Sequence, residues 1–354
     1  MTKKYYSNHV HTDRSNFRLK DAINKVDAVI DYAVELGLQG VTISDHETLA
    51  AHIEAIQYVK KGKENGKIPK DFKLGLGNEI YLLDRDEVAS ARENNEPTRY
   101  YHFLLTAKDK KGYMGLKELS SQAWKNSFWH RGMERVPTYK DELEEVMKKY
   151  KGHIIATSAC LGSEFAQTVL HYVRNGDMVS KRKIHELVTW YVELFGDDFY
   201  IELQPSEQPD QLDYNKMAIN IANGYGIKTV VATDAHYLNK DQAFIHETYL
   251  KSDEGEREVA SFYSTTYLMS VDELWDFFKP HISREYFESM LDNTLEISNK
   301  IQEYDLKLDT VVPKVDIPEF KLEHYFKDYY DKYEYIRKYA YSPNIEDNYH
   351  LYQV

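Results

Sequence analysis

The sequence predicts an α/β protein, built either as a β/α barrel or as a doubly wound sheet. Seven short apolar segments of strand length alternate with longer stretches whose apolar residues recur at helical spacing. This alternation is typical of a mostly parallel sheet covered by helices. No glycine-rich phosphate-binding motif follows any of the seven segments, so a nucleotide-binding version of either fold is not indicated.

The expected elements follow directly from this pattern. We expect strands at 5–11, 40–45, 73–83, 99–108, 153–158, 199–204 and 228–234. We expect helices near 21–37, 48–64, 112–125, 138–150, 163–174, 180–195 and 210–225, and a further one from about 240. The polar stretch 84–98, which separates two of the strands, is expected to be a loop.

Composition and charge limit the class of protein. The 354 residues are 42% apolar and 29% charged, which is ordinary for a soluble globular chain. Neither an apolar run of about 18 residues nor a signal peptide is present, and the single cysteine fits a reducing compartment, so we expect a cytoplasmic protein with no membrane association. The net charge of −13 argues against a broad basic surface for nucleic acid, but not against a small site where bound cations supply positive charge.

The character of the chain changes after about residue 275. Residues 321–354 contain 9 of the 30 tyrosines. This segment could be a helical appendage that packs on the main domain, or the first part of a further domain. We therefore divide the chain into a main domain at 1–275 and a helical extension or linker at 276–354.

Side chains that can bind metals cluster where the predicted strands end. Neighbouring strand ends converge on one face of a β/α barrel, and active sites are built there. His9 and His11 alternate on one strand and therefore point to the same side. The full set of candidate metal ligands is His9, His11, Asp21, His46, Glu79, His102, Cys160, Asp234 and His236.

His102 is the apparent exception, because it lies near the start of its strand. If 73–83 and 99–108 pair as an antiparallel hairpin, Glu79 and His102 are equally far from the middle of the loop and lie side by side. The exception thus becomes a prediction of local antiparallel pairing.

Each candidate also has an ordinary structural explanation. Asp21 and Asp45 could cap the helices that follow them, Cys160 could be a small buried apolar residue, and the His9–His11 pair could be a surface feature. Each explanation is acceptable for one residue. A shared metal site explains all of these residues at successive strand ends better than a separate explanation for each one.

The same motifs resemble a known family. The order H-x-H, D, D-H, E, H, "SACLGSE" and D-x-H is similar to that of the PHP (polymerase and histidinol phosphatase) superfamily. Longer stretches, such as "HVHTDRSNFRLKDAINKVDAVIDYAVELGLQGVTISDHETL" and "ATDAHYLNKDQA", resemble the PHP domain of bacterial or phage DNA polymerase III alpha subunits. The resemblance covers roughly residues 5–270, and "VPKVDIPEF" resembles the link towards polymerase domains.

The resemblance implies a distorted seven-stranded TIM-like barrel that holds up to three divalent metal ions. It assigns His9, His11, Glu79 and Asp234 to the first ion. The second ion would share Glu79 and add His102 and Cys160. The third would take Asp21, His46 and His236, while Asp45 would orient a histidine.

This donor set suits Zn²⁺ and also tolerates Mn²⁺ or Fe²⁺. The resemblance implies a metal-dependent phosphoesterase, a 3′–5′ exonuclease that proofreads during DNA replication, with Glu79, Asp234 and His236 as its catalytic residues. Its partners would be a DNA 3′ end or another phosphate ester, and polymerase domains of the same parent chain. The alternatives are a small-molecule phosphatase or pyrophosphatase, and a non-catalytic module braced by its metals.

Two sets of side chains remain as secondary expectations around this site. Arg14, Arg18 and Arg131 are candidate phosphate contacts, or ordinary surface charges. Glu202 and Tyr237 are weaker candidates for the rim of the cavity.

Overall fold

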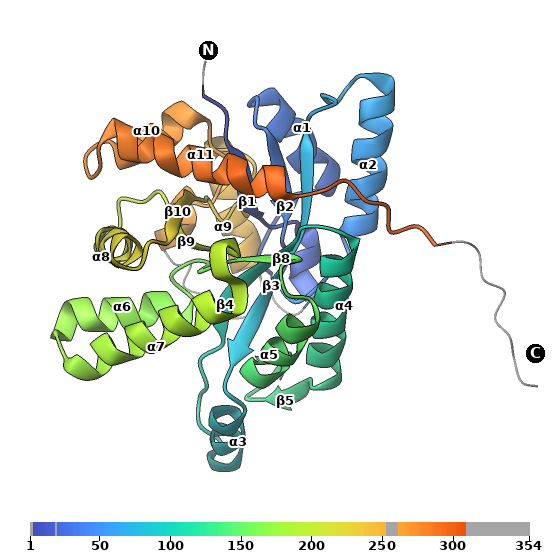
Figure 1. Ribbon diagram of the computed structural model, residues 1–354. Helices are drawn as coiled ribbons and strands as arrows, with labels where there is room; N and C mark the ends of the chain where they lie inside the picture. The colour runs from blue at the N-terminus through green and yellow to red at the C-terminus, as the bar shows by residue number, and fades with distance from the viewer. Residues whose placement is uncertain (1–2, 18–19, 253–260, 309–354) are drawn as a thin grey trace, which may run out of the picture. The chain divides into compact units, whose positions relative to one another are not determined.

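A curled eight-stranded sheet, seven of whose strands form one continuous path, lies at the centre of the compact unit that ends at Leu306 (Figure 1). The computed structural model describes residues 3–17, 20–252 and 261–308. The sheet order is β1-β2-β3-β4-β8-β9-β10, and β7 pairs with β3 outside this path. The strands are β1 (Tyr6–Val10), β2 (Gly40–Ile43), β3 (Lys73–Leu83), β4 (Tyr101–Ala107), β7 (Thr138–Tyr139), β8 (Ile154–Thr157), β9 (Phe199–Leu203) and β10 (Lys228–Val231).

The sheet curls until its first and last strands meet. Val10, at the end of β1, forms a parallel bridge with Ala235, just after β10. The His11 amide donates to the Ala235 carbonyl at 2.9 Å, and the Ala235 amide donates to the His9 carbonyl at 3.2 Å. All seven strands of the path lie within the predicted segments, so the distorted seven-stranded α/β barrel is confirmed.

Helices cover the outside of the sheet. In Figure 1, α6, α7 and α8 gather on one flank, whereas α2 packs near α1 and β3. The helices are α1 (Val26–Glu35), α2 (His52–Asn65), α3 (Arg85–Asn94), α4 (Lys110–Lys125), α5 (Lys140–Lys149), α6 (Glu164–Asn175), α7 (Met178–Phe195), α8 (Pro209–Tyr225), α9 (Ala243–Lys251), α10 (Val271–Phe278) and α11 (Arg284–Lys300). Short 3₁₀ turns lie at Asp13–Phe17, Gly196–Asp198, Lys240–Gln242 and Ser261–Thr265.

Strands β3 and β4 pair antiparallel, as the position of His102 predicts. The register differs from the expected one by two residues: His102 lies opposite Tyr81, and Glu79 lies opposite Leu104. Residues two apart on one strand share a face of the sheet, so the Glu79 and His102 side chains still meet diagonally.

The expectation of a loop at 84–98 is wrong, because most of this stretch forms α3. Its polar residues include good helix formers, and its two buried apolar residues, Val88 and Ala91, lie three apart on one helical face. Val88 packs in a small apolar cluster with Leu83 and Tyr139. The sequence also gave no signal for the short hairpin of β5 (Phe128–His130) and β6 (Met133–Arg135).

The two last described helices continue the same compact unit, which extends to Leu306. Helix α11 packs against the starts of β1 and β10: the Tyr6 amide donates to Thr294 Oγ1 at 3.0 Å, and Asn293 Nδ2 donates to the Thr229 carbonyl at 2.8 Å. Helical structure after residue 275 is therefore present, while the division at 275/276 stays a prediction. The tyrosine-rich segment 321–354 lies outside the described residues. No helix within the described ranges is long and apolar enough to cross a membrane.

Candidate metal centre

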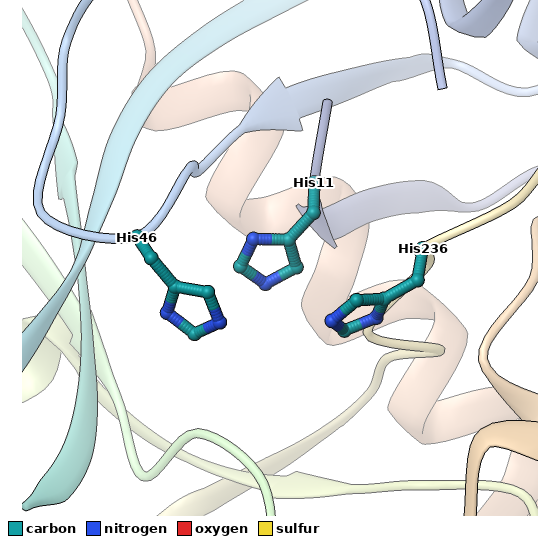
Figure 2. A group of neighbouring side chains, drawn as sticks. All are labelled: His11, His46 and His236. Atoms are coloured by element: carbon teal, nitrogen blue, oxygen red, sulfur yellow. The ribbon is translucent and has the colours of Figure 1, made fainter. Parts of the chain in front are cut away.

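One end of the sheet, formed by the carboxyl ends of the parallel strands and the amino end of the antiparallel β4, brings the predicted metal-binding side chains together. His9 lies in β1, Glu79 in β3 and His102 in β4, and the others follow β1, β2, β8 and β10 or lie in the loop before α1. Figure 2 shows three of them, His11, His46 and His236, with their rings turned towards a common space. The ring centroid of His11 lies 4.4 Å from that of His46 and 4.6 Å from that of His236.

Four of these side chains form a tight, fully enclosed cluster of His9, His11, Glu79 and Asp234. The two imidazole Nε2 atoms lie 3.1 Å apart, and each lies 3.1 Å from Asp234 Oδ1. Glu79 Oε2 lies 3.4 Å from His9 Nε2 and 3.1 Å from His11 Nε2. Ligands at about 2.0–2.1 Å from a tetrahedral Zn²⁺ are separated from each other by about 3.3 Å, so these four atoms fit around one cation.

A second group forms around Asp21. Its Oδ2 lies 3.3 Å from His46 Nε2 and 3.1 Å from His236 Nε2. Asp21 does not cap a helix, because α1 begins five residues later and its N-cap is Lys25. The carboxylate is instead buried in a loop and directed at two imidazoles.

His102 and Cys160 lie on the other side of Glu79. His102 Nδ1 is 3.0 Å from Glu79 Oε1 and 3.5 Å from Cys160 Sγ. Burial and the negative charge of Asp234 and Glu79 raise the pKa of the Cys160 thiol well above its usual value. The thiol therefore keeps its proton unless a cation beside it replaces that proton.

Hydrogen bonds behind three of the histidines fix which ring nitrogen faces the cluster. His9 Nδ1 lies 2.8 Å from Glu202 Oε1, and His236 Nδ1 lies 2.6 Å from the Asp234 carbonyl, so in each ring Nδ1–H donates. The Nε2 atom of each ring is left with its lone pair towards the site.

His11 is oriented through a relay rather than directly. Its Nδ1 lies 3.0 Å from Ser15 Oγ, and Ser15 Oγ–H donates to Asp45 Oδ1 at 2.9 Å. Thr12 also donates to Asp45, from both its amide and its hydroxyl group. The carboxylate therefore holds Ser15, which accepts from His11. Asp45 does not cap α2, whose N-cap is Ala51.

The buried acceptor atoms in the centre lack donors. Glu79 Oε2, Asp234 Oδ1 and Asp21 Oδ2 receive no hydrogen bond from any described residue, and His46 Nδ1 has no hydrogen-bond partner there either. Unpaired buried acceptors are costly, and three carboxylate oxygens together are unusual. Imidazole, carboxylate and thiol donors around such a space fit divalent metal ions.

The charges of the centre also indicate that the buried carboxylates need positive charge beside them. Burial raises the pKa of Glu79 and of Asp21, but nearby imidazoles outweigh burial and hold both pKa values well below the usual range. Burial lowers the pKa of His11, yet the Asp234 and Glu79 carboxylates beside its ring raise it to about 10. The carboxylates therefore need positive charge beside them, either as protons on the histidines or as bound cations.

The loops that carry the centre contain unusual backbone conformations. Glu47, Ala159 and Asp234 have φ values of 57°, 54° and 50°, in the left-handed region that residues other than glycine rarely adopt. Each is itself in the candidate ligand set or next to a member of it. Such strain is often found at functional sites.

A cavity of about 430 Å³ opens onto the centre. Its walls include Asp21, His46, His102, Cys160, Asp234 and His236. They also include residues that no sequence motif marks as functional: Phe17, Tyr81, Arg99, Trp124 and Tyr263. Glu202 and Tyr237 are not at the rim, because both are fully buried behind the walls.

Neither Arg14 nor Arg131 lines the cavity. Arg14 Nη2 pairs with Glu54 Oε2 at 3.0 Å, and Arg131 Nη1 donates to the Asn95 carbonyl at 2.9 Å. Arg18 lies outside the described residues. Among the described residues lining the cavity, Arg99 is the only arginine or lysine.

Comparison with known proteins places this geometry in a family. Residues 7–206 match the family model described as the PHP domain. The chain belongs to the PHP family. The matched residues run from β1, beginning at its second residue, to the loop after β9. They include most of the candidate ligands.

The relatives of this PHP domain include large polymerases. The chain is 45% identical over 351 residues to "Probable DNA polymerase YorL" of Bacillus subtilis and covers 27% of that protein. It is 30% identical over 345 residues to the DNA polymerase III subunit alpha of Aquifex aeolicus, again covering 27%. These matches cover 97% and 93% of the present chain, which thus spans about a quarter of the length of these relatives.

A solved structure from Bifidobacterium adolescentis, provisionally described as a metal-dependent phosphoesterase, is 14% identical and aligns with a TM-score of 0.40. The alignment covers 80% of the present chain and 98% of that protein.

Proposed function

We propose that this PHP domain is the phosphoesterase module of a polymerase of the DNA polymerase III alpha type. In this proposal it hydrolyses the terminal phosphodiester bond at a DNA 3′ end. The observation that carries the proposal is the group of buried carboxylate oxygens without a hydrogen-bond donor, two of which belong to residues that line an open cavity, Asp21 and Asp234. A cavity of about 430 Å³ is large enough for a nucleotide-sized group to reach these oxygens.

We infer that up to three divalent ions, Zn²⁺ or else Mn²⁺ or Fe²⁺, bind here. The first would take the enclosed cluster of His9, His11, Glu79 and Asp234, whose atoms lie at tetrahedral spacing. The second would add His102 and Cys160 to Glu79. The third would take Asp21, His46 and His236.

The ions, when bound, would lower the pKa of a water molecule and neutralise charge on the phosphate. The residues of the chain do the positioning. Glu79 is placed to serve two ions, because Oε2 faces His9 and His11 while Oε1 faces His102. Asp234 and His236 lie on the same short loop after β10 and line the cavity, where they can meet a substrate. We therefore propose these three as the catalytic residues.

The partners follow from the relatives. Because the chain matches only about a quarter of each polymerase, we propose that polymerase domains of the same parent chain present the DNA end to this cavity. In this proposal the protein works in the cytoplasm.

The test uses the 354-residue chain, stripped of metal and reloaded with Zn²⁺ or Mn²⁺. A 5′-labelled single-stranded DNA with a free 3′-OH should be shortened stepwise on a denaturing gel. His11→Ala and Asp234→Ala should each reduce the rate by at least about 100-fold, because each removes a ligand from the enclosed cluster. His185→Ala, at an exposed histidine on α7, is the matched control and should cut like the wild type.

Parallel assays separate this proposal from its alternatives. Phosphate release from p-nitrophenyl phosphate or pyrophosphate, with DNA left intact, would indicate a small-molecule phosphatase instead. Bound metal that raises the melting temperature without hydrolysis of any of these substrates would indicate a structural module.

A further inference from the structure

The mouth of the cavity carries an aromatic surface that the metal centre does not require. Phe17 lines the cavity, yet 63% of its surface is exposed. Its ring meets that of Trp124 edge to face, with centroids 6.3 Å apart and planes at 71°. An exposed phenylalanine is ordinary on its own, but here it lines the cavity and contacts a second aromatic ring, so both rings are placed to contact a ligand that enters.

Trp124 is fixed relative to the metal centre. Its Nε1–H donates to the Glu47 carbonyl at 2.8 Å, and Glu47 directly follows the candidate ligand His46. The Glu47 amide in turn donates to the Glu79 carbonyl at 2.9 Å. The indole ring is therefore positioned by the same loop that presents His46, which preorganises the aromatic surface for a ligand that reaches the centre.

Arg99 adds a positive charge at the same entrance. No hydrogen bond or ion pair to a described residue engages its guanidinium group, whereas Arg14 and Arg131 are both engaged elsewhere. In a chain of net charge −13, an uncommitted arginine beside a carboxylate-rich cavity can contact an anionic group of a ligand.

We propose that the cavity mouth is a nucleoside-binding subsite, in which Phe17 and Trp124 stack on a base and Arg99 contacts a backbone phosphate. This proposal rests on the proposed function in taking a DNA 3′ end as the ligand. Every base has an apolar face, so stacking on aromatic rings binds single strands without sequence preference. It also gives an acidic chain affinity for DNA that does not depend on a basic surface.

The test measures binding by the Mn²⁺-loaded chain, with fluorescence anisotropy as the readout. One probe is a fluorescein-labelled hexathymidylate with a phosphorothioate at its 3′-terminal linkage. The other has the same backbone, but abasic residues at its last two positions. The wild type should bind the thymidine probe at least about fivefold more tightly, because stacking on one aromatic side chain contributes roughly five- to 100-fold in affinity.

Substitutions identify the side chains responsible. Phe17→Leu and Trp124→Leu should each reduce the preference for the thymidine probe about fivefold or more, and Phe17→Tyr, which keeps the ring, should retain it. Phe244→Leu, at an exposed phenylalanine on α9 that does not line the cavity, should keep the wild-type preference. Arg99→Ala should weaken both probes and reduce the slope of log K against log salt by about 0.7, the value expected for one phosphate contact.

Two results of the binding test would overturn the subsite. One is that the wild type binds neither probe. The other is that the wild type, Phe17→Leu and Trp124→Leu all show the same preference for the thymidine probe over the abasic probe. Because Phe17 is exposed, its substitution should leave the melting temperature unchanged, so a folding defect cannot mask the result. Base-selective binding without any DNA cutting would retain the subsite and refute the proposed hydrolysis.

Discussion

Glu202 shows how a residue behind the metal centre can control it. Its side chain is fully buried and accepts hydrogen bonds from His9 Nδ1 at 2.8 Å, Thr157 Oγ1 at 2.9 Å and Gln204 Nε2 at 2.9 Å. A carboxylate behind a histidine sets its tautomer and makes its other nitrogen a better ligand. Glu202 therefore acts through His9, as a positioning residue.

We expect Glu202→Gln to weaken binding of the ion proposed for the His9 cluster by about 10- to 100-fold. The amide keeps the size of the side chain, but it removes the negative charge that supports donation from His9 Nδ1. Competition with a chromogenic chelator measures the affinity. Glu186→Gln, on the exposed face of α7, is the control and should bind metal like the wild type. Equal affinity in the two variants would show that Glu202 does not tune His9.

At the level of single residues, sequence predicts the centre better than the cavity around it. All nine candidate ligands lie in one place, as predicted. They could be predicted because short polar motifs at strand ends are visible in the sequence. Their metal-binding roles stay a prediction. Phe17, Arg99 and Trp124 had no such signal. Trp124 reaches the cavity from the last turn of α4, where its spacing matches that of an ordinary buried helical residue.

Among the elements, β2 is positioned by a close contact between its backbone and that of β3. Gly40 and Lys73 are partners at the start of this parallel pair. A Cβ atom at residue 40 would lie 1.9 Å from the Lys73 carbonyl oxygen, which belongs to the backbone and cannot rotate away. Strand β2 leads directly to the loop of Asp45 and His46, so its position also sets that part of the centre.

We expect Gly40→Ala to lower the free energy of unfolding by about 3 kcal/mol, because the two strands must separate to admit the methyl group. Gly224→Ala is the matched control: it lies in α8, where the added carbon would meet no atom within 4 Å beyond its chain neighbours and the backbone of its own helix, and it should stabilise the chain by about 0.5–1 kcal/mol. Urea denaturation measures both. Equal stability of the two variants would contradict the close approach.

The elements that sequence predicts well are those with a single strong periodicity. The long amphipathic helices and the seven buried strands were predicted within a few residues. Helix α3 was missed because only Val88 and Ala91 of its ten residues are buried, which leaves a pattern that looks like a polar loop. The β5–β6 hairpin turns at Arg131 and Gly132, both with positive φ, and arginine gives no turn signal at such a position.

For the molecule as a whole, the candidate metal ligands lie at both ends of the curled sheet. His9 and His11 belong to the first strand and the residue after it, and Asp234 and His236 follow the last strand. These edges are otherwise held at this end by the Val10–Ala235 bridge and its backbone hydrogen bonds. A cation bound between them would therefore hold the sheet closed.

We expect metal removal by a chelator to lower the melting temperature by roughly 5 °C. An ion present at about 100 times its dissociation constant stabilises the folded state by about 2.7 kcal/mol. Asp234→Ala should melt at the same temperature with and without chelator, whereas Asp210→Ala, at an exposed residue of α8, should show the full shift. Differential scanning calorimetry measures these temperatures. A chelator shift that survives in Asp234→Ala would place the stabilising ion elsewhere.

The seam between β1 and β10 also has a consequence for biosynthesis. A ribosome delivers His9 and His11 before the other strands, and Asp234 and His236 only after those strands have emerged. A nascent chain cannot assemble the enclosed cluster until β10 has been released and has reached β1. If the cluster binds an ion as proposed, metal capture would therefore be a late, post-assembly event in the life of the chain, and cells starved of that ion would accumulate chains whose seam opens to proteases.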